Sequence, residues 1–331
     1  MDTAAFSIDF STFSEQDFNT AALALFRYQY EHVALYQEYC RLLRKSPEQV
    51  AKLEDIPFLP ISFFKSHTVF HKAKKPCDFF SSSGTTGQIT SRHYFENLSG
   101  YEASFIQAFH HFYGDPKEWT ILALLPNYLE RSGSSLVYMV EKLIALSGSE
   151  ESGFFLHNHS ELNARLAKLE ARGSKTLLIG VSFALLDFIE AFPQQLRSTT
   201  VMETGGMKGK RKEMIKPELH AVLKAGFGVN SIHSEYGMTE LFSQGYSQGN
   251  NVFDAPPWMK IGIRNINDPL SVDFTTPQGG AINVIDLANT DSCAFIATDD
   301  LGNLHANKQF EILGRMDRSE MRGCNLMVQD L

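Results

Sequence analysis

The sequence has few cysteines, and the four that occur lie far apart. Cys40, Cys77, Cys293 and Cys324 form no C-x-x-C pair, and no histidine accompanies them at the spacing of a zinc finger. The eleven histidines contain no H-E-x-x-H motif. These residue types therefore predict no metal site. We expect reduced thiols, with Cys40, Cys77 and Cys293 acting as packing residues.

The sequence also lacks an excess of positive charge and any long apolar run. Its net charge is −8, and its only dense basic run is KGKRK at 208–212, which we interpret as the solvated start of a helix. Nucleic-acid binding needs clustered Lys and Arg, so we expect no nucleic-acid partner. The N-terminus, MDTAAFSIDF, lacks the pattern of a signal peptide, and no apolar run approaches the roughly 18 residues of a membrane span. We expect a cytoplasmic protein without a membrane span.

The N-terminal segment has helical periodicity. Apolar residues recur at spacings of three and four from Ser14 to about Leu43. A further helix is predicted from Ser46, with Pro47 at its first position and Gln49 reaching back to the cap. Two prolines in DIPFLPISFFKSH then interrupt the helical pattern. We assign residues 1–55 to an N-terminal helical segment.

Strand and helix patterns alternate after this segment. The predicted strands are WTILALLP (119–126), KTLLIGV (175–181), STTVMET (198–204) and VNSIHSE (229–235). Helical patterns such as LVYMVEKLIAL and FALLDFIEAF lie between them, and this alternation favours an α/β core with a largely parallel sheet at 56–249. The runs AINVIDL, SCAFIAT and FEILGRM predict a small antiparallel β subdomain at 250–313, followed by a tail at 314–331.

Ligands bind outside the carboxyl ends of parallel strands, so the loops after strands are the candidate sites. The first such loop is DFFSSSGTTGQITSRHY, residues 78–94. Its hydroxyls and glycine amides can surround a phosphate. It lacks the lysine of G-x-x-x-x-G-K-[ST], which excludes a Walker-type site. A flexible Ser/Gly linker has a similar composition and needs no ligand.

Three further loops combine residue types that suit a nucleotide. METGGMKG (202–209) holds paired glycines, which let a flat ring or a phosphate approach the backbone or simply form a turn. HSEYGMTELF (233–242) joins a ring, a hydroxyl and a carboxylate, although Thr239 and Glu240 also suit a helix N-terminus. ATDDLGNL (297–304) precedes FEILGRMDR (310–318), and its Asp-Leu-Gly is typical of a hairpin turn.

Taken in order, SSSGTTG, GG, YGMTE, TDDLG and GRMD resemble the motifs of the adenylate-forming superfamily of acyl- and aryl-CoA ligases, firefly luciferases and peptide-synthetase adenylation domains. The resemblance spans about residues 78–318. The short length, the lead-in IPFLPISFFK and the ending GRMDRSEMRGCNLMVQDL are more similar to LuxE-type acyl-protein synthetases. Those proteins resemble phenylacetate-CoA ligases in their nucleotide site and carry an acyl group on a cysteine near the C-terminus.

The resemblance implies an adenylate-forming α/β core with a small antiparallel β subdomain and without the full C-terminal swinging domain. It implies ATP and Mg²⁺ as cofactors and a carboxylic acid, more narrowly a fatty acid, as substrate. The loop implied to hold the ATP phosphates consists of Ser82, Ser83, Gly84, Thr85, Thr86 and Gly87. The other implied nucleotide contacts are Gly205, Gly206 and Tyr236 at adenine with Gly237 beside them, Thr239 at the α-phosphate, Glu240 at Mg²⁺, and Asp300 with Arg315 at the ribose.

Two departures from the superfamily pattern matter for the chemistry. Most members supply a lysine to the substrate carboxylate from the swinging domain, whereas a short tail follows Asp317 here and MRGC stands where that lysine is expected. Lys65, on the lead-in, and Lys208, beside the glycine pair, are the candidates to replace it. Cys324 is the candidate acyl acceptor, because the neighbouring Arg322 favours its thiolate, or else a structural residue of the tail.

We therefore predict an acid–thiol ligase of the acyl-protein synthetase type. It would convert the acid to acyl-AMP with release of pyrophosphate and transfer the acyl group to Cys324, and the resemblance implies a reductase-like or carrier-protein partner that receives it. Three alternatives stay open. The acceptor could be coenzyme A, or the chain could be a nucleotide-binding module without catalysis. Ser182 in LLIGVSFALLDF also comes within one residue of the G-x-S-x-G nucleophile elbow of α/β-hydrolases.

Overall fold

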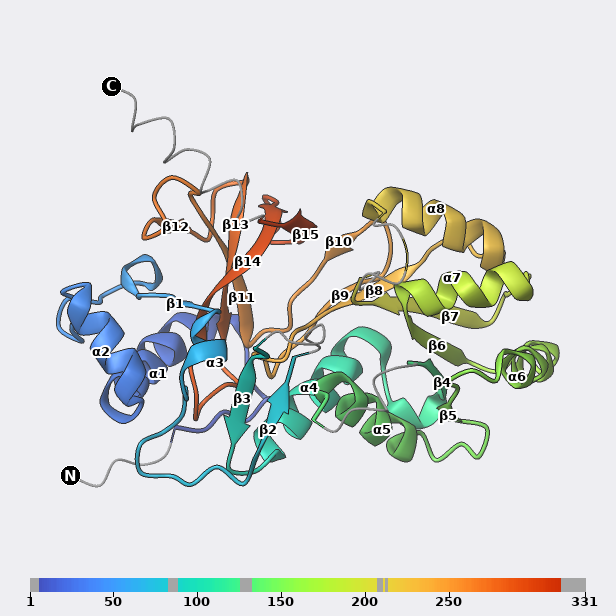
Figure 1. Cartoon of the computed structure of the whole chain (residues 1–331), viewed down its shortest axis with the longest axis horizontal. Helices are drawn as coiled ribbons and strands as arrows, with labels where there is room; N and C mark the ends of the chain where they lie inside the picture. Colours follow the sequence, from blue (N-terminus) through green and yellow to red (C-terminus); the bar gives the residue numbers. More distant parts are fainter. Residues whose placement is uncertain (1–5, 83–88, 126–132, 207–210, 212–213, 317–331) are drawn as a thin grey trace.

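The computed structural model describes residues 6–82, 89–125, 133–206, 211 and 214–316 of the chain. These residues form two larger sheets, a separate two-stranded hairpin and helices packed around them (Figure 1). The helices are α1 (Phe18–His32), α2 (Ala34–Leu42), α3 (Phe63–Ser66), α4 (Ser99–Tyr113), α5 (Ser135–Ser147), α6 (His159–Ala171), α7 (Ser182–Ala191) and α8 (Lys216–Phe227). Short 3₁₀ turns lie at η1 (Glu15–Asp17), η2 (Leu53–Asp55) and η3 (Pro116–Glu118).

The six-stranded sheet forms the α/β part of the molecule. Its strands, in the order β5-β4-β6-β7-β8-β9, are β5 (Gly153–Phe154), β4 (Thr120–Leu124), β6 (Thr176–Val181), β7 (Thr199–Thr204), β8 (His233–Tyr236) and β9 (Gly245–Ser247). The first five run parallel, and β9 is antiparallel to β8. Every residue of β4 and β6 is buried, as expected for a parallel sheet covered on both faces. The four predicted strands are confirmed here as β4, β6, β7 and β8.

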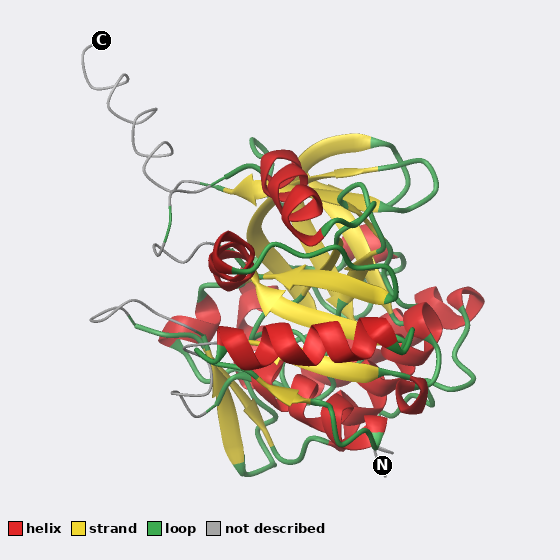
Figure 2. Ribbon diagram, turned by 90° about the vertical axis from the view of Figure 1, so that its right-hand side faces the viewer, coloured by secondary structure: helices red, strands yellow, loops and turns green. Residues whose placement is uncertain are grey.

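Helices cover this sheet from both sides. Figure 1 shows α7 and α8 on one side and α4 and α5 on the other, and Figure 2 shows the strands lying between helices. The predicted helical patterns are confirmed as α5 and α7. Among the described residues, no helix has both the length and the apolar character needed to cross a bilayer.

The seven-stranded sheet is mainly antiparallel, which confirms the β texture predicted for the C-terminal part. Its path is β10 (Val252–Phe253), β15 (Phe310–Arg315), β14 (Phe295–Leu304), β13 (Gln278–Asp286), β11 (Met259–Arg264) and β12 (Val272–Asp273), and β1 (Leu59–Pro60) pairs in parallel with β14. The N-terminal helices pack on this sheet. Phe26 of α1 meets Phe295 edge to face at 6.1 Å between ring centroids, and the Gln29 amide donates to the carbonyl of Asn289 (2.7 Å).

Two predicted loops have a different structure. The Ser/Gly stretch does not follow a parallel strand, because β2 (Asp78–Ser81) and β3 (Arg92–Phe95) pair in antiparallel fashion and the stretch connects them. The segment 297–304 is not a hairpin turn but part of β14, a strand of ten residues. Pairing with β13 on one side and β15 on the other keeps this segment extended in spite of its turn-like composition.

Local predictions near the N-terminus also need correction. The helix predicted from Ser14 to Leu43 is divided into α1 and α2, because Val33 is buried in an extended conformation with φ −104° and ψ 99°. No helix begins at Ser46. Its backbone N–H donates to the Gln49 side chain (2.9 Å), but the chain makes only one turn there before burying Val50.

One interpretation of a side chain was also wrong. Cys77 is exposed, whereas Cys40 and Cys293 are buried as predicted. The basic run at 208–212 lies outside the described residues except for Arg211, and α8 begins at Lys216. Within that run Arg211 is described, and it forms ion pairs with Asp187 and Glu190 of α7.

Candidate functional site

The site lies at the carboxyl ends of two neighbouring strands. β7 and β8 run parallel, with Thr204 opposite Glu235. The glycine pair after β7 and the Tyr-Gly pair at the end of β8 therefore leave the sheet at the same edge, although 31 positions separate register partners such as Thr204 and Glu235 in the chain. The parallel register brings two of the predicted loops together.

The glycines at this edge have specific structural reasons. Gly205 has φ +68°, a left-handed conformation that side chains disfavour. A Cβ added to Gly237 would lie 2.3 Å from Glu235 Oε1, so a side chain would collide with a buried carboxyl group. A Cβ added to Gly206 would meet no heavy atom of the described residues within 4 Å, so this part of the structure leaves room for a ligand to approach the glycine.

Tyr236, Asp300 and Arg315 form one hydrogen-bonded chain between the two large sheets. The Tyr236 hydroxyl donates to Asp300 Oδ2 (2.8 Å), and Arg315 Nε donates to Asp300 Oδ1 (3.1 Å). Asp300 and Arg315 are register partners on β14 and β15. Tyr236 and Asp300 are buried, whereas the Arg315 side chain is 77% exposed. Each Asp300 oxygen accepts one bond from these partners and keeps a further lone pair for a ligand.

Glu240 follows on the same loop and is buried. Burial raises the pKa of its carboxyl group, while a hydrogen bond with Ser91 and the positive charges of Arg315 and Lys65 lower it. These three partners come from different places: Ser91 directly precedes β3, Arg315 ends β15 and Lys65 lies on α3. The structure therefore brings Glu240 together with the hairpin, the antiparallel sheet and the lead-in.

Three side chains that sequence reasoning missed hold the backbone of this loop. His93 Nδ1 donates to the carbonyl of Thr239 (2.9 Å), and burial lowers the pKa of this imidazole to about 4, which keeps it neutral. Asn289 Nδ2 donates to the carbonyl of Glu240 (3.0 Å), and Asp286 Oδ2 accepts from the backbone N–H of Phe242 (2.6 Å). The loop is a turn and no helix starts at Thr239, so the alternative of a helix N-terminus is wrong. No local sequence pattern marks these side chains.

Ser182 supports the glycine loop from inside. Its hydroxyl lies 3.0 Å from Glu203 Oε2 and 3.2 Å from the carbonyl oxygen of Gly205, and the residue is fully buried. A nucleophile must reach its substrate, and this hydroxyl is enclosed between two acceptors. The geometry therefore disfavours Ser182 as the nucleophile of an α/β-hydrolase.

The start of the predicted phosphate loop is described, and most of the loop is not. Ser82 pairs with Ser91 across the hairpin: its hydroxyl accepts from the Ser91 backbone N–H (2.9 Å), and its own N–H donates to the Ser91 carbonyl (3.1 Å). The predicted site residues outside the described part of the chain are Ser83, Gly84, Thr85, Thr86, Gly87, Lys208 and Cys324.

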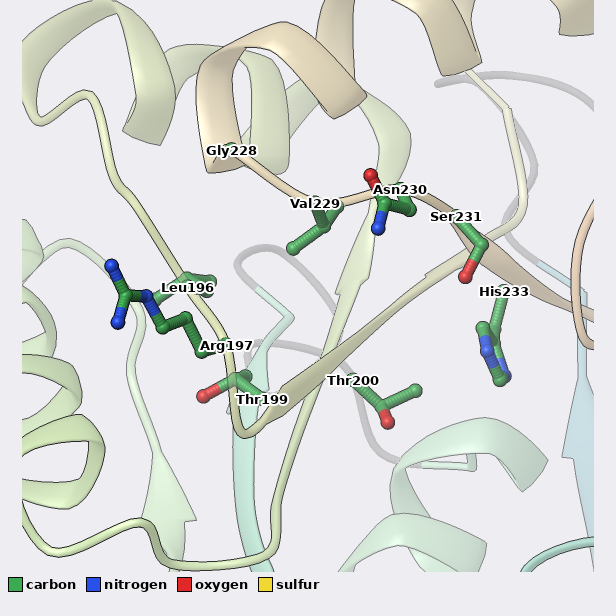
Figure 3. A pocket seen from close by; sticks show the side chains of 9 residues that line it. All are labelled: Leu196, Arg197, Thr199, Thr200, Gly228, Val229, Asn230, Ser231 and His233. Atoms are coloured by element: carbon green, nitrogen blue, oxygen red, sulfur yellow. The ribbon is translucent and has the colours of Figure 1, made fainter.

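Two hollows border the described residues. One, of about 470 Å³, is lined by residues of the segments 64–68 and 89–94 and includes Lys65. The other, of about 480 Å³, lies where β7 and β8 begin, next to Thr199 and His233 (Figure 3). Since the glycine pair and Tyr236 lie where these strands end, the second hollow is at the opposite edge of the sheet.

Comparison with known proteins identifies the architecture. No protein-family model matches the sequence, and no curated protein matches it. The chain is similar to a solved structure of 2-hydroxyisobutyryl-CoA ligase in complex with 2-HIB-AMP and CoA, with a TM-score of 0.66 and 13% identity over 92% of this chain and 69% of that chain. It is similar to ATP-bound MatB from Rhodopseudomonas palustris, with a TM-score of 0.54 and 16% identity over 74% of this chain and 49% of that chain.

A third similar structure is the luciferase-like enzyme from the mealworm Zophobas morio, with a TM-score of 0.52 and 14% identity over 74% of this chain and 58% of that chain. The fold is that of the adenylate-forming enzymes. The predicted fold class is thereby confirmed, including the antiparallel C-terminal sheet. At these identities the adenylate-forming fold describes architecture, and the activity has to be argued from the site.

Proposed function

We propose that this chain activates a carboxylic acid with ATP and Mg²⁺, releases pyrophosphate, and transfers the acyl group of the resulting acyl-AMP to a thiol. The observation that carries this proposal is the hydrogen-bonded chain of Tyr236, Asp300 and Arg315 beside the buried Glu240. A ring, a diol-binding carboxylate and a second carboxylate meet at one edge of the sheet, as a nucleotide with a bound cation requires. The CoA ligase solved with 2-HIB-AMP and MatB solved with ATP, which share this fold, support it.

We assign the nucleotide contacts from this arrangement. Tyr236 and the open face at Gly206 would flank adenine, and Asp300 would accept hydrogen bonds from the ribose hydroxyls. Thr239 would contact the α-phosphate. The β2–β3 loop, including Ser82, would hold the phosphate chain with its hydroxyls and amides.

Glu240 is the residue of the site that fits Mg²⁺. It offers a hard oxygen ligand in a fixed position, and burial alone raises the pKa of its carboxyl group. A divalent cation would favour the charged form of this carboxyl group, and the charged carboxylate is the form that binds the cation. When bound, Mg²⁺ would neutralise phosphate charge next to this carboxylate.

The chemistry that we propose has two steps. A carboxylate oxygen of the acid attacks the α-phosphorus, the bond to the bridging oxygen breaks, and pyrophosphate leaves with that electron pair. A thiolate then attacks the acyl carbonyl, AMP leaves, and a thioester forms. Lys65, whose charge acts on Glu240, would orient the substrate carboxylate; Lys208 is the second candidate.

We propose Cys324 as the thiol and a fatty acid as the substrate, both on the LuxE-type resemblance of the sequence. The acyl group would then pass to a reductase-like or carrier-protein partner. Coenzyme A is the alternative acceptor, as for the ligase that was solved with CoA.

The first test is carboxylate-dependent exchange of labelled pyrophosphate into ATP, with acids from benzoate to palmitate. We expect exchange with one class of acid and its loss in Glu240→Ala. The exposed Glu218→Ala on α8 is the matched control and should retain exchange. A protein that binds ATP but exchanges with no acid would favour the nucleotide-binding module without catalysis.

The second test is mass spectrometry after incubation with ATP and the acid that supports exchange. We expect one added acyl group on Cys324, absent in Cys324→Ser and retained in Cys77→Ser, because Cys77 is the exposed thiol that serves as a control. An unmodified Cys324 together with free acyl-CoA, when CoA is supplied, would identify CoA as the acceptor.

A further inference from the structure

The strand that carries Asp300 departs from the regular sheet pattern at this residue. β13 and β14 pair in antiparallel fashion on both sides of an irregularity. The register partners that flank it are Ala281 with Leu301 and Asn283 with Ala297. One residue of β13, Ile282, therefore stands against the three residues 298–300 of β14. Such a bulge interrupts the ladder of backbone hydrogen bonds and redirects side chains, so the backbone groups within it need other partners.

The Thr298 side chain supplies part of what the ladder loses. This residue is fully buried, and its hydroxyl donates to the carbonyl of Ile282 (2.8 Å). The same hydroxyl accepts from the backbone N–H of Asp300 (3.1 Å). It also lies within hydrogen-bonding reach of Tyr236, whose own hydroxyl donates to the Asp300 carboxylate. One hydroxyl thus joins the two strands at the bulge to both residues of the candidate nucleotide site.

Arg264 closes the bulge from the third strand. It ends β11, which pairs with β13 on the side away from β14 (Figure 1). Its Nη1 donates to the carbonyl of Ile282 (2.9 Å) and to Asn283 Oδ1 (2.7 Å). Its Nη2 donates to the carbonyl of Thr298 (2.6 Å). A planar guanidinium fork can bridge two strands in this way, whereas the single ammonium group of a lysine cannot.

The burial of Arg264 is costly and therefore needs a reason. Among the described residues it is the only buried arginine or lysine, and its hydrogen bonds printed above all end on neutral oxygen atoms. Burial lowers the pKa of this guanidinium, and the nearby carboxylates of Asp299 and Asp300 counteract that effect. A buried charge of this kind destabilises a sheet that apolar side chains could fill, so we look for its reason in the shape of the bulge.

We propose that Arg264 and Thr298 are positioning residues, which shape the bulge of β14 so that the Asp300 carboxylate is aimed at the ribose of a bound nucleotide. This inference rests on the proposed contact between Asp300 and the ribose. Without either side chain, polar backbone groups at 298–300 lose their partners and the carboxylate is no longer held in one position, so the ribose diol binds more weakly. The proposed adenine and phosphate contacts lie on other loops and should keep their strength.

Calorimetric titration of ATP and of 2′,3′-dideoxy-ATP tests the inference with a matched pair of variants. Thr298→Val keeps the shape of the side chain and removes the hydroxyl, whereas Thr298→Ser keeps the hydroxyl and removes a methyl group. We expect Thr298→Val to lower the preference for ATP about three- to tenfold, the effect of a lost hydrogen bond, and Thr298→Ser to retain the preference. Arg264→Lys should also lower it, and Arg27→Lys, at an exposed position of α1, is the control.

Hydrogen exchange of the nucleotide-free protein gives a second readout that needs no ligand. The N–H of Asp300 is bonded to the Thr298 hydroxyl, so peptides that include residues 298–301 should exchange faster in Thr298→Val. They should exchange at the wild-type rate in Thr298→Ser, and peptides from β6 should be unchanged in both variants. Should Arg264→Lys fail to fold, the Thr298 pair still decides the question.

The inference is overturned if Thr298→Val keeps the wild-type preference, if it weakens both nucleotides equally, or if Thr298→Ser loses the preference to the same extent. A wild type that does not distinguish the two nucleotides, or binds neither, would remove the ribose contact and this inference with it. If the preference depends on Thr298 but no acid supports pyrophosphate exchange, the proposed adenylation fails while the positioning role stands.

Discussion

The proposed contact between Asp300 and the ribose predicts that replacing Asp300 by asparagine removes a preference for ribonucleotides. The Asp300 oxygens accept from the Tyr236 hydroxyl (2.8 Å) and from Arg315 Nε (3.1 Å). In Asp300→Asn the amide oxygen has to face Arg315, because a guanidinium group cannot accept a hydrogen bond. The amide nitrogen then faces Tyr236, whose oxygen can accept. One of the two oxygens that we propose as acceptors for the ribose diol is lost, and the other no longer carries charge.

The size of the effect follows from this exchange. A hydrogen bond to a charged group contributes about 1.5–3 kcal/mol, and one between neutral groups about 0.5–1.5 kcal/mol. The ribose therefore loses about 1.5–3 kcal/mol of binding free energy, or roughly ten- to a hundredfold in the dissociation constant. The fold should tolerate the change, because asparagine has the shape of aspartate and both of its neighbours keep a partner.

The assay compares ATP with 2′,3′-dideoxy-ATP by calorimetric titration. The wild type should prefer ATP by roughly ten- to a hundredfold, and Asp300→Asn should lose most of that preference, since only ATP offers the diol. Asp268→Asn, in the exposed loop between β11 and β12, is the matched control. A variant that keeps the wild-type preference, or a wild type that has none, would refute the assignment of Asp300 to the ribose.

Two further predictions concern stability. Gly226→Ala should lower the free energy of unfolding by about 1–3 kcal/mol, because a Cβ there would lie 2.4 Å from Ile189 Cδ1 and the clash outweighs a gain in helix propensity of about 1 kcal/mol. In Gly100→Ala the added Cβ would lie 3.8 Å from the nearest heavy atom, so this variant should keep the gain in helix propensity. Equal changes in the free energy of urea unfolding for the two variants would contradict the close contact between Gly226 and Ile189. Burial raises the pKa of Glu235 to about 7. The folded state therefore holds a proton that the unfolded chain releases near pH 4.5. The contribution of this proton to the free energy of unfolding is lost as the pH rises from 4.5 through 7. Glu235→Gln stays neutral and should gain about 2–3 kcal/mol over the wild type between pH 5 and pH 8, whereas a pH-independent difference would contradict the buried carboxyl.

The Glu235→Gln variant has to be compared with the wild type at each pH, because other buried groups change the free energy of unfolding in the opposite direction. Burial lowers the pKa of His93 and of His233 to about 4. Each histidine therefore lowers the stability of the protein as the pH falls below the ordinary histidine range, whereas Glu235 lowers it as the pH rises. The difference between two proteins that share both histidines isolates the carboxyl group.

The elements that the sequence predicted well are those whose signal is local. β4 and β6 are fully buried, so their residues form continuous apolar runs that turn residues bound on each side. The parallel register then places Gly205 and Tyr236 at one edge without further information. Both the α/β core and the meeting of two site loops could be inferred this way.

The hairpin and the position of Asp300 could not be inferred, because pairing with distant strands decides both. β2 and β3 have four residues each, too few to show a period. The segment around Asp300 contains Asp, Gly and Asn, residues typical of turns, but two neighbouring strands hold it extended. Local composition predicts a turn there, and tertiary pairing overrides it.

The residues that hold the loop after β8 were missed for the same reason, and they show how the candidate site is assembled. His93 reaches Thr239 across 146 positions of sequence, and Tyr236 reaches Asp300 across 64. Neither contact lies within a single sheet. The bond between His93 and Thr239 joins the hairpin to the loop after β8, and the bond between Tyr236 and Asp300 joins the parallel sheet to the antiparallel one. The proposed adenine, ribose and Mg²⁺ contacts therefore take their positions only when the three sheets pack together, so packing at these junctions and nucleotide affinity should vary together.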